Sequence, residues 1–201
     1  KDIFPGPGSS APQELTPLGN LVYFTAEDES GAIRLWRTDG TPEGTLPVET
    51  EARAPLALTV RDSMLYFSAT RAEEGRELWI MGPDRPAELV RDIAPGPASS
   101  SPRNIVIFKD GIYFLADDGV HGEELWRSDG TAAGTVMVRD IVPIPFEKLS
   151  YDAIAPTADA LYLAAGSGTQ GIELWRYFPD ALRPMPVKDI ATWDSATRQG
   201  P

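Results

Sequence analysis

One two-part marker recurs four times along the chain, and it constrains the fold more than any other feature of the sequence. The first part is a tyrosine followed by a large apolar residue, and the second is Leu-Trp; we call them the Tyr-Phe and Leu-Trp markers. The Tyr-Phe markers lie at Tyr23-Phe24, Tyr66-Phe67, Tyr113-Phe114 and Tyr162-Leu163, and the tryptophans of the Leu-Trp markers are Trp36, Trp79, Trp126 and Trp175. Both parts are spaced by 43, 47 and 49 residues. Two markers kept in register at this period predict an array of four equivalent supersecondary units.

Each unit is predicted to form four short strands. In the third unit we expect them at residues 104–109, 112–116, 123–128 and 135–141, with a tight hairpin at Asp110-Gly111 and a turn at Asp129-Gly130-Thr131. Neighbouring residues of a strand point to opposite faces, so the Leu-Trp marker makes both faces apolar. A sheet with two apolar faces must be covered on both sides. The pattern therefore predicts an all-β protein, a four-bladed β-propeller of four-stranded antiparallel blades.

We expect residues 1–201 to form a single propeller domain, with units at about 4–50, 51–96, 97–144 and 145–191 and a C-terminal tail, 192–201, that holds the non-repeated Trp193. A connector that begins Asp-Ile recurs at Asp2, Asp92, Asp140 and Asp189. In a closed ring of four, residues 1–3 and 189–190 would compete for one position. The simplest resolution is that residues 1–3 are the remnant of an upstream segment and lie beside the ring. The alternatives are a longer array and a homo-oligomer.

The run Glu-Leu-Trp-Arg-Ser-Asp-Gly-Thr-Ala-Ala-Gly-Thr at 124–135, followed by Val-Arg-Asp-Ile at 138–141, resembles the bacterial ELWxSDGTxxGT repeat proteins. The likeness is specific in the first and third units and partial in the others, where the Asp-Gly-Thr turn is lost. It implies a propeller-like fold and a secreted or cell-surface location in a bacterium. It brings no catalytic residue set with it.

Composition excludes several classes of function. The formal net charge of -12 argues against a nucleic-acid partner, because phosphate binding needs clustered lysines and arginines. The chain has no cysteine, which excludes disulfides and thiolate chemistry. No run of 18 apolar residues occurs, so no membrane-spanning helix is expected.

The candidate ligand-binding residues are Asp117, Asp118, His121 and Glu123, in one predicted hairpin loop. Carboxylates held close repel one another, and calcium would relieve that repulsion; the other interpretation is a loop whose carboxylates point into water. No other cofactor is expected. Asp39 and Asp129 are expected to cap their own turns rather than contact a ligand. The four repeated tryptophans are expected to pack between blades, a carbohydrate platform being the alternative.

These observations favour a non-catalytic binding or scaffold module for a protein or glycan partner. The alternatives are a glycan-acting hydrolase and a calcium- or sugar-dependent lectin, which would use carboxylates near the channel or the loops.

Overall fold

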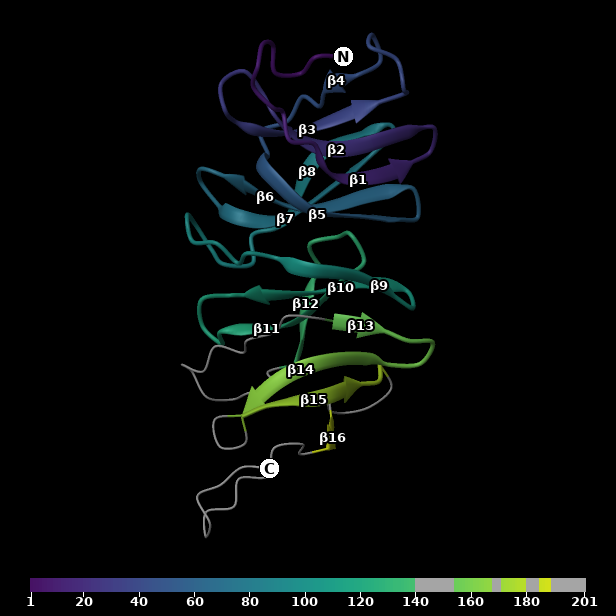
Figure 1. Ribbon diagram of the computed structural model, residues 1–201. Helices are drawn as coiled ribbons and strands as arrows, with labels where there is room; N and C mark the ends of the chain where they lie inside the picture. Colours follow the sequence, from purple (N-terminus) through teal and green to yellow (C-terminus); the bar gives the residue numbers. More distant parts are fainter. Residues whose placement is uncertain (140–153, 168–170, 180–184, 189–201) are drawn as a thin grey trace, which may run out of the picture.

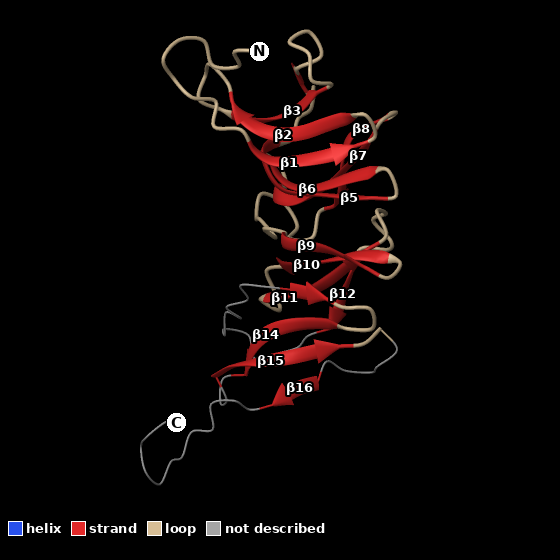
Figure 2. Cartoon of the chain, turned by 45° about the vertical axis from the view of Figure 1, so that its right-hand side comes forward, coloured by secondary structure: helices blue, strands red, loops and turns tan. Residues whose placement is uncertain are grey.

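The computed structural model describes residues 1–139, 154–167, 171–179 and 185–188, and every regular element in this part of the chain is a strand (Figure 2). Four four-stranded antiparallel sheets follow one another in chain order. The first holds β1 (Gln13–Leu18), β2 (Leu21–Glu27), β3 (Ile33–Thr38) and β4 (Leu46–Pro47). The second holds β5 (Arg53–Arg61), β6 (Met64–Arg71), β7 (Gly75–Gly82) and β8 (Arg85–Arg91). The third holds β9 (Arg103–Phe108), β10 (Gly111–Asp117), β11 (Glu123–Ser128) and β12 (Val136–Arg139). The fourth holds β13 (Ile154–Pro156), β14 (Leu161–Ser167), β15 (Gly171–Tyr177) and β16 (Met185–Lys188).

The predicted all-β architecture of four-stranded units is confirmed. In the third unit β9, β10 and β11 begin within one residue of their predicted starts, and β12 begins at Val136. The end predicted for that strand, the connectors at Asp140 and Asp189 and the tail with Trp193 lie outside the described residues. Within the described part, no helix has the length and apolar character needed to cross a membrane.

The second and third sheets pack against neighbouring sheets through both faces, as the markers predicted, and the first and fourth sheets do so through one face. Between the second and third sheets, Tyr66 and Leu78 of the second sheet meet Phe114 and Trp126 of the third in one buried cluster. Tyr113 of the third sheet belongs instead to the cluster with the fourth. The Tyr and Leu of the markers thus face the following sheet, whereas the Phe and Trp face the preceding one.

The described residues show the four sheets as a row, and they do not confirm the predicted ring. The first and fourth sheets lie at opposite ends of the stack (Figure 1). Leu174 of the fourth sheet, whose side faces away from the third, is 38% exposed, whereas its counterparts Leu35, Leu78 and Leu125 are at most 1% exposed. The ring was predicted from the two apolar faces of each unit and from the length of the repeat. Two apolar faces dictate that sheets stack, but they carry no information on how far each sheet turns relative to the last.

The first strand of each sheet runs along one edge of the row, where β1 contacts β5, β5 contacts β9 and β9 contacts β13. In three of these strands a bulge places a non-glycine residue in the left-handed region, Glu14 (φ 58°), Ala57 (φ 57°) and Asn104 (φ 53°). The bulge turns Glu14 toward the second sheet, where its Oε2 accepts a hydrogen bond of 3.1 Å from the amide of Leu58. We call this edge, formed by the first strand of each sheet, the inner edge. Its sheets are therefore joined by a hydrogen bond as well as by packing.

Candidate functional site

The four residues predicted to bind a ligand lie together at the turn between β10 and β11, but Asp117 and Asp118 are bonded within the turn and Glu123 is bonded to a neighbouring strand. Asp118 Oδ1 accepts the amides of Val120 (2.9 Å) and His121 (2.8 Å), and its Oδ2 lies 2.7 Å from Nδ1 of His121. Asp117 Oδ1 accepts the amide of Gly119 at 2.7 Å. Glu123 is held by Arg103 of β9 through two hydrogen bonds of 2.6 Å. The loop is an internally bonded turn.

Electrostatics agree with that description. Partial burial alone would raise the pKa of Asp118, but its hydrogen bonds from His121 and Val120 outweigh the burial and lower it. No group of three or more His, Asp or Glu side chains among the described residues could hold a metal ion. The calcium hypothesis for this loop therefore gains no support, and its role in ligand binding stays a prediction.

The Asp-Gly-Thr turns of the first and third sheets have the capping role that was predicted for them. Asp129 Oδ1 accepts the amide of Thr131 at 2.9 Å and its hydroxyl at 2.7 Å, and the Thr131 hydroxyl in turn accepts the amide of Gly134. Asp39 makes the same two bonds to Thr41 at 2.9 and 2.7 Å. The hydrogen bonds from these threonine side chains lower the pKa of both aspartates. These carboxylates hold turns together.

Three of the repeated tryptophans, Trp79, Trp126 and Trp175, lie between sheets, whereas Trp36 packs against its own sheet and Ile3. Trp36, Trp79 and Trp126 are buried, and Trp175 is partly buried. Trp79 and Trp126 each donate their Nε1 hydrogen to a backbone carbonyl of the neighbouring strand, Ala69 and Ala116, at 3.1 Å. Packing between sheets is confirmed for Trp79 and Trp126, and Trp36 is buried without a second sheet against it. A carbohydrate platform needs exposed rings, which these three do not offer.

The glutamate that precedes the Leu-Trp marker has a role that the sequence reasoning missed. Glu77 of β7 is fully buried, and its carboxylate accepts the amides of Ile93 (3.1 Å), Ala94 (3.2 Å) and Ser100 (3.1 Å) together with the Ser100 hydroxyl. The three residues that supply these four donor groups belong to the loop 92–102, which connects the second sheet to the third. Burial raises the pKa of Glu77, and the four hydrogen bonds oppose that rise.

This carboxylate therefore fixes the path of the chain between two sheets. Its counterparts Glu124 and Glu173 are also buried, at 1% and 6% exposure. The first sheet has Arg34 at the equivalent position, and it is followed by a short connector, residues 48–52, without the Asp-Ile-Xaa-Pro-Gly sequence. In the sequence, the glutamate and the long connector are present together or absent together. That correlation is the signal that would have revealed this bonding of the glutamate to its connector, which we call the Glu77 lock.

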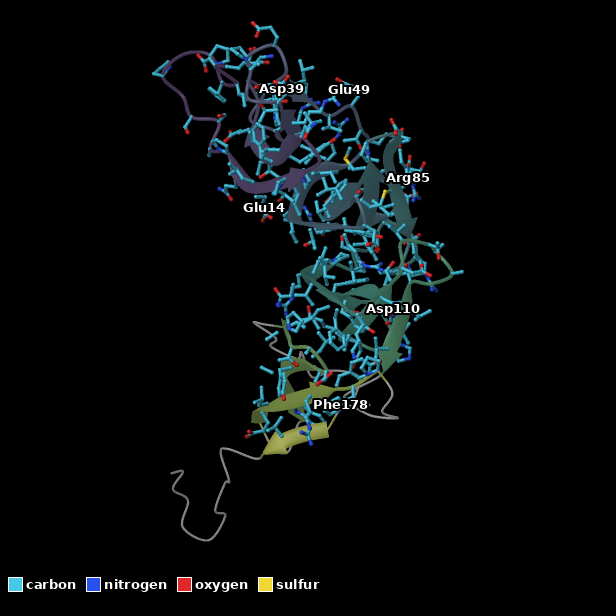
Figure 3. The ribbon with its side chains drawn as sticks, turned by 90° about the vertical axis from the view of Figure 1, so that its right-hand side faces the viewer. Glu14, Asp39, Glu49, Arg85, Asp110 and Phe178 are labelled. Carbon is cyan, nitrogen blue, oxygen red and sulfur yellow. The ribbon has the colours of Figure 1, made fainter. Side chains whose placement is uncertain are left out.

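A cleft of about 290 Å³ opens between the outer parts of the first and second sheets. One wall comes from the first sheet, with Tyr23, Arg37 and Glu49, and the other from the turn between β7 and β8, with Pro83 and Arg85. Glu49 and Arg85 lie on the same side of the row (Figure 3). Arg85 is paired with Glu88 through bonds of 3.1 and 3.0 Å, whereas Arg37 is exposed and has no ion-pair partner among the described residues. The cleft joins an aromatic ring, prolines and the exposed Arg37, and its lining also holds the carboxylates of Glu49 and Asp84.

No protein-family model matches the chain, and no curated protein matches it in sequence. Solved structures do match. A puromycin-hydrolyzing peptidase of Mycobacterium tuberculosis aligns over 92% of this chain and 33% of its own, with a TM-score of 0.59 at 14% identity. Prolyl oligopeptidase B from Galerina marginata aligns over 85% of this chain and 25% of its own, with a TM-score of 0.54 at 12% identity.

A computationally designed protein, Ika8, aligns over 84% of this chain and 46% of its own, with a TM-score of 0.50 at 15% identity. The chain thus spans less than half the length of each of these structures. The regions of the peptidases that match are β-propeller domains. At these identities the likeness concerns the fold alone, which is the stacking of four-stranded antiparallel sheets.

Proposed function

We propose that the four sheets are successive blades of a β-propeller and that the protein is a non-catalytic binding or scaffold module, secreted or at the cell surface. Three features support the blade assignment: the strand order within each sheet, the face-to-face packing of successive sheets, and the likeness to peptidase propeller domains. The extracellular location rests on the resemblance to the ELWxSDGTxxGT repeat proteins.

The cleft between the first two sheets carries the proposal of a binding role. The aspartate carboxylates of the acidic loop and of the Asp-Gly-Thr turns are bonded within their own turns, so they stabilise those turns. The cleft, in contrast, has an exposed guanidinium at Arg37 in a protein of net charge -12. Its volume of about 290 Å³ is near the lower end for a small-molecule site, which fits a few side chains of a partner. We propose that it receives an extended segment of a protein partner that places one carboxylate on Arg37.

A displayed library of random peptides, selected on the intact protein, tests this proposal. Enriched peptides should carry a carboxylate beside apolar residues, and Arg37→Glu should abolish their binding. Arg53→Glu is the matched control, because Arg53 is exposed on β5 and its substitution makes the same change in charge outside the cleft. Peptides that bind Arg37→Glu as well as the wild type would contradict the cleft as the site. Turnover of a glycan or peptide panel by the purified protein would contradict a non-catalytic role.

A further inference from the structure

The N-terminal segment repeats the connector between the second and third sheets, in sequence and in conformation. Residues 2–12 match residues 92–102 at a constant offset of 90, from Asp-Ile to the final proline. Gly6 and Gly96 both have a left-handed φ, 104° and 84°, and so do Ala11 and Ser101, at 41° and 51°. The two loops therefore follow the same path.

Both loops bind the sheet that follows them through equivalent hydrogen bonds. Lys1 Nζ donates to the carbonyl of Thr45 at 3.0 Å, as Arg91 Nη1 donates to that of Thr135 at 2.6 Å. The carbonyl of Ser10 accepts the amide of Glu27 at 2.8 Å, in the same way that the carbonyl of Ser100 accepts the amide of Asp117 at 2.9 Å. With respect to the following sheet, the N-terminal loop is complete.

The N-terminal loop lacks the contacts that loop 92–102 makes with the sheet before it. Loop 92–102 wraps the Glu77 carboxylate with its amides and the Ser100 hydroxyl, and Ile93, Ala94 and Ser100 are buried. The corresponding residues Ile3, Phe4 and Ser10 are only half-buried. Among the described residues, no hydrogen-bond acceptor is found for their amides or for the Ser10 hydroxyl. The N-terminal loop thus presents the donor set of a carboxylate site.

A second observation comes from the side chain of Trp36. Its indole packs against Ile3 of the loop and is 7% exposed, yet its Nε1 has no hydrogen-bond partner. Its counterparts Trp79 and Trp126, which do face a preceding sheet, both donate at 3.1 Å to a carbonyl on the adjacent strand of their own sheet. The indole of Trp36 is therefore not seated as its counterparts are, and a buried donor without an acceptor is uncommon in a well-packed interface.

The Asp-Gly-Thr turn of the first sheet is open on the same side. A Cβ added to Gly130 of the third sheet would lie 2.7 Å from the hydroxyl of Tyr66, because that turn rests on the second sheet. A Cβ added to Gly40 would meet no atom within 4 Å.

We propose that the loop 2–12, with Trp36 and the turn at Gly40, is the docking surface for a further four-stranded sheet of the same repeat, whose Glu-Leu-Trp strand places its glutamate carboxylate on the amides of Ile3, Phe4 and Ser10. The site in the third sheet shows the complete form of this interface. The three glutamates that precede a Leu-Trp marker in this chain are already committed: Glu77 binds its own connector, and Glu124 and Glu173 are buried and have partners of their own. The occupant is therefore an additional unit rather than the last sheet of a second copy.

The direct test adds such a unit to the intact protein. A duplicate of residues 53–91 is joined to Asp2 in place of Lys1, which reproduces the natural junction between Arg91 and Asp92. Hydrogen exchange at the amides of Ile3, Phe4 and Ser10 should become about tenfold slower or more than in the parent chain. The matched control carries Glu77→Gln in the duplicate only, and the protection should be lost. Equal exchange rates in the fusion and the parent, or protection that survives the glutamine, would overturn the proposal.

A loop exchange tests the same site without relying on an added sheet. Residues 92–102 are replaced by the sequence of residues 2–12, with Ala94 retained because that position is buried. The exchanged loop should hold Glu77, so the chimera should melt close to the wild type and lose as much stability on Glu77→Gln as the wild type does. A chimera that is indifferent to Glu77→Gln would overturn the proposal. Protection of Ile3 and Ser10 in the parent that rises with protein concentration would assign the site to a second copy and would likewise overturn it.

Discussion

At the scale of single residues, the informative groups are carboxylates that bind backbone amides. Glu77 is fully buried, yet it faces four donors and no cation, so hydrogen bonds rather than an ion pair offset its desolvation. Asp129 and Asp118 bind amides in the same way at exposed turns. The acidic residues of this protein therefore include a set that stabilises chain geometry.

Glu77→Gln should destabilise the protein by about 1–3 kcal/mol, because the amide NH₂ of glutamine meets backbone donors where an acceptor is needed. The measurement is denaturant unfolding of the two proteins at neutral pH. Glu73→Gln, an exposed change in the preceding turn, is the control and should leave the midpoint unchanged. Equal stability of Glu77→Gln and wild type would contradict the lock.

The turn at Asp28 should make the protein sensitive to acid. Hydrogen bonds, foremost that from the Ser30 hydroxyl, lower the pKa of Asp28 from 3.8 to about 2. Because the unfolded chain takes up the proton first, this contribution is present above pH 3.8 and is lost as the pH falls toward 2. Asp28→Asn should therefore show a shallower fall in Tm over this range than the wild type does. Parallel profiles for the two proteins would refute the assignment, and Glu29→Gln serves as a neighbouring charge control.

At the scale of elements, the sequence predicted strands and their faces well, and it did so for a physical reason. A strand places adjacent residues on opposite faces, so Leu125 and Trp126 report two interfaces directly. It did not reveal the Glu77 lock, because a single glutamate before an apolar pair is typical of a solvated strand end. The acidic loop was misleading for a related reason: spacing brings Asp117, Asp118 and Glu123 together, but local amides and Arg103 compete for their oxygens.

Truncation of the repeated tryptophans should show the position of each sheet in the row. Trp126→Ala removes a ring that is 4% exposed between two sheets and should cost about 3–5 kcal/mol. Trp175→Ala should cost clearly less, because that ring, which faces the third sheet, is only partly buried. Chemical denaturation of both variants provides the comparison. Equal losses would indicate that the interface between the third and fourth sheets buries its tryptophan in solution as fully as the interface between the second and third.

At the scale of the whole molecule, stacking without closure leaves two terminal faces of different character. The first sheet ends in the donor loop 2–12, and the fourth ends in a face where Leu174 is exposed. The number of units in the sequence predicted four sheets, but closure depends on the rotation between neighbouring sheets, which no residue pattern reports.

Small-angle scattering with a parallel mass measurement separates the row from a ring. A compact chain of 201 residues has a radius of gyration of about 17 Å. A monomer arranged as a row should give a clearly larger value. A monomer near 17 Å would instead support closure of the four sheets on themselves.

The edges of the sheets have a consequence for how such a molecule polymerises. Along the inner edge, the left-handed residues Glu14, Ala57 and Asn104 interrupt the ladder of β1, β5 and β9, so an added strand would find no continuous row of partners. Along the outer edge, which is formed by the last strand of each sheet, β4 is two residues long and contains Pro47, and β8 contains Pro86. Both edges thus resist the strand-by-strand addition that leads to amyloid. If further units are added as proposed above, they therefore join through the face of an end sheet as whole folded sheets.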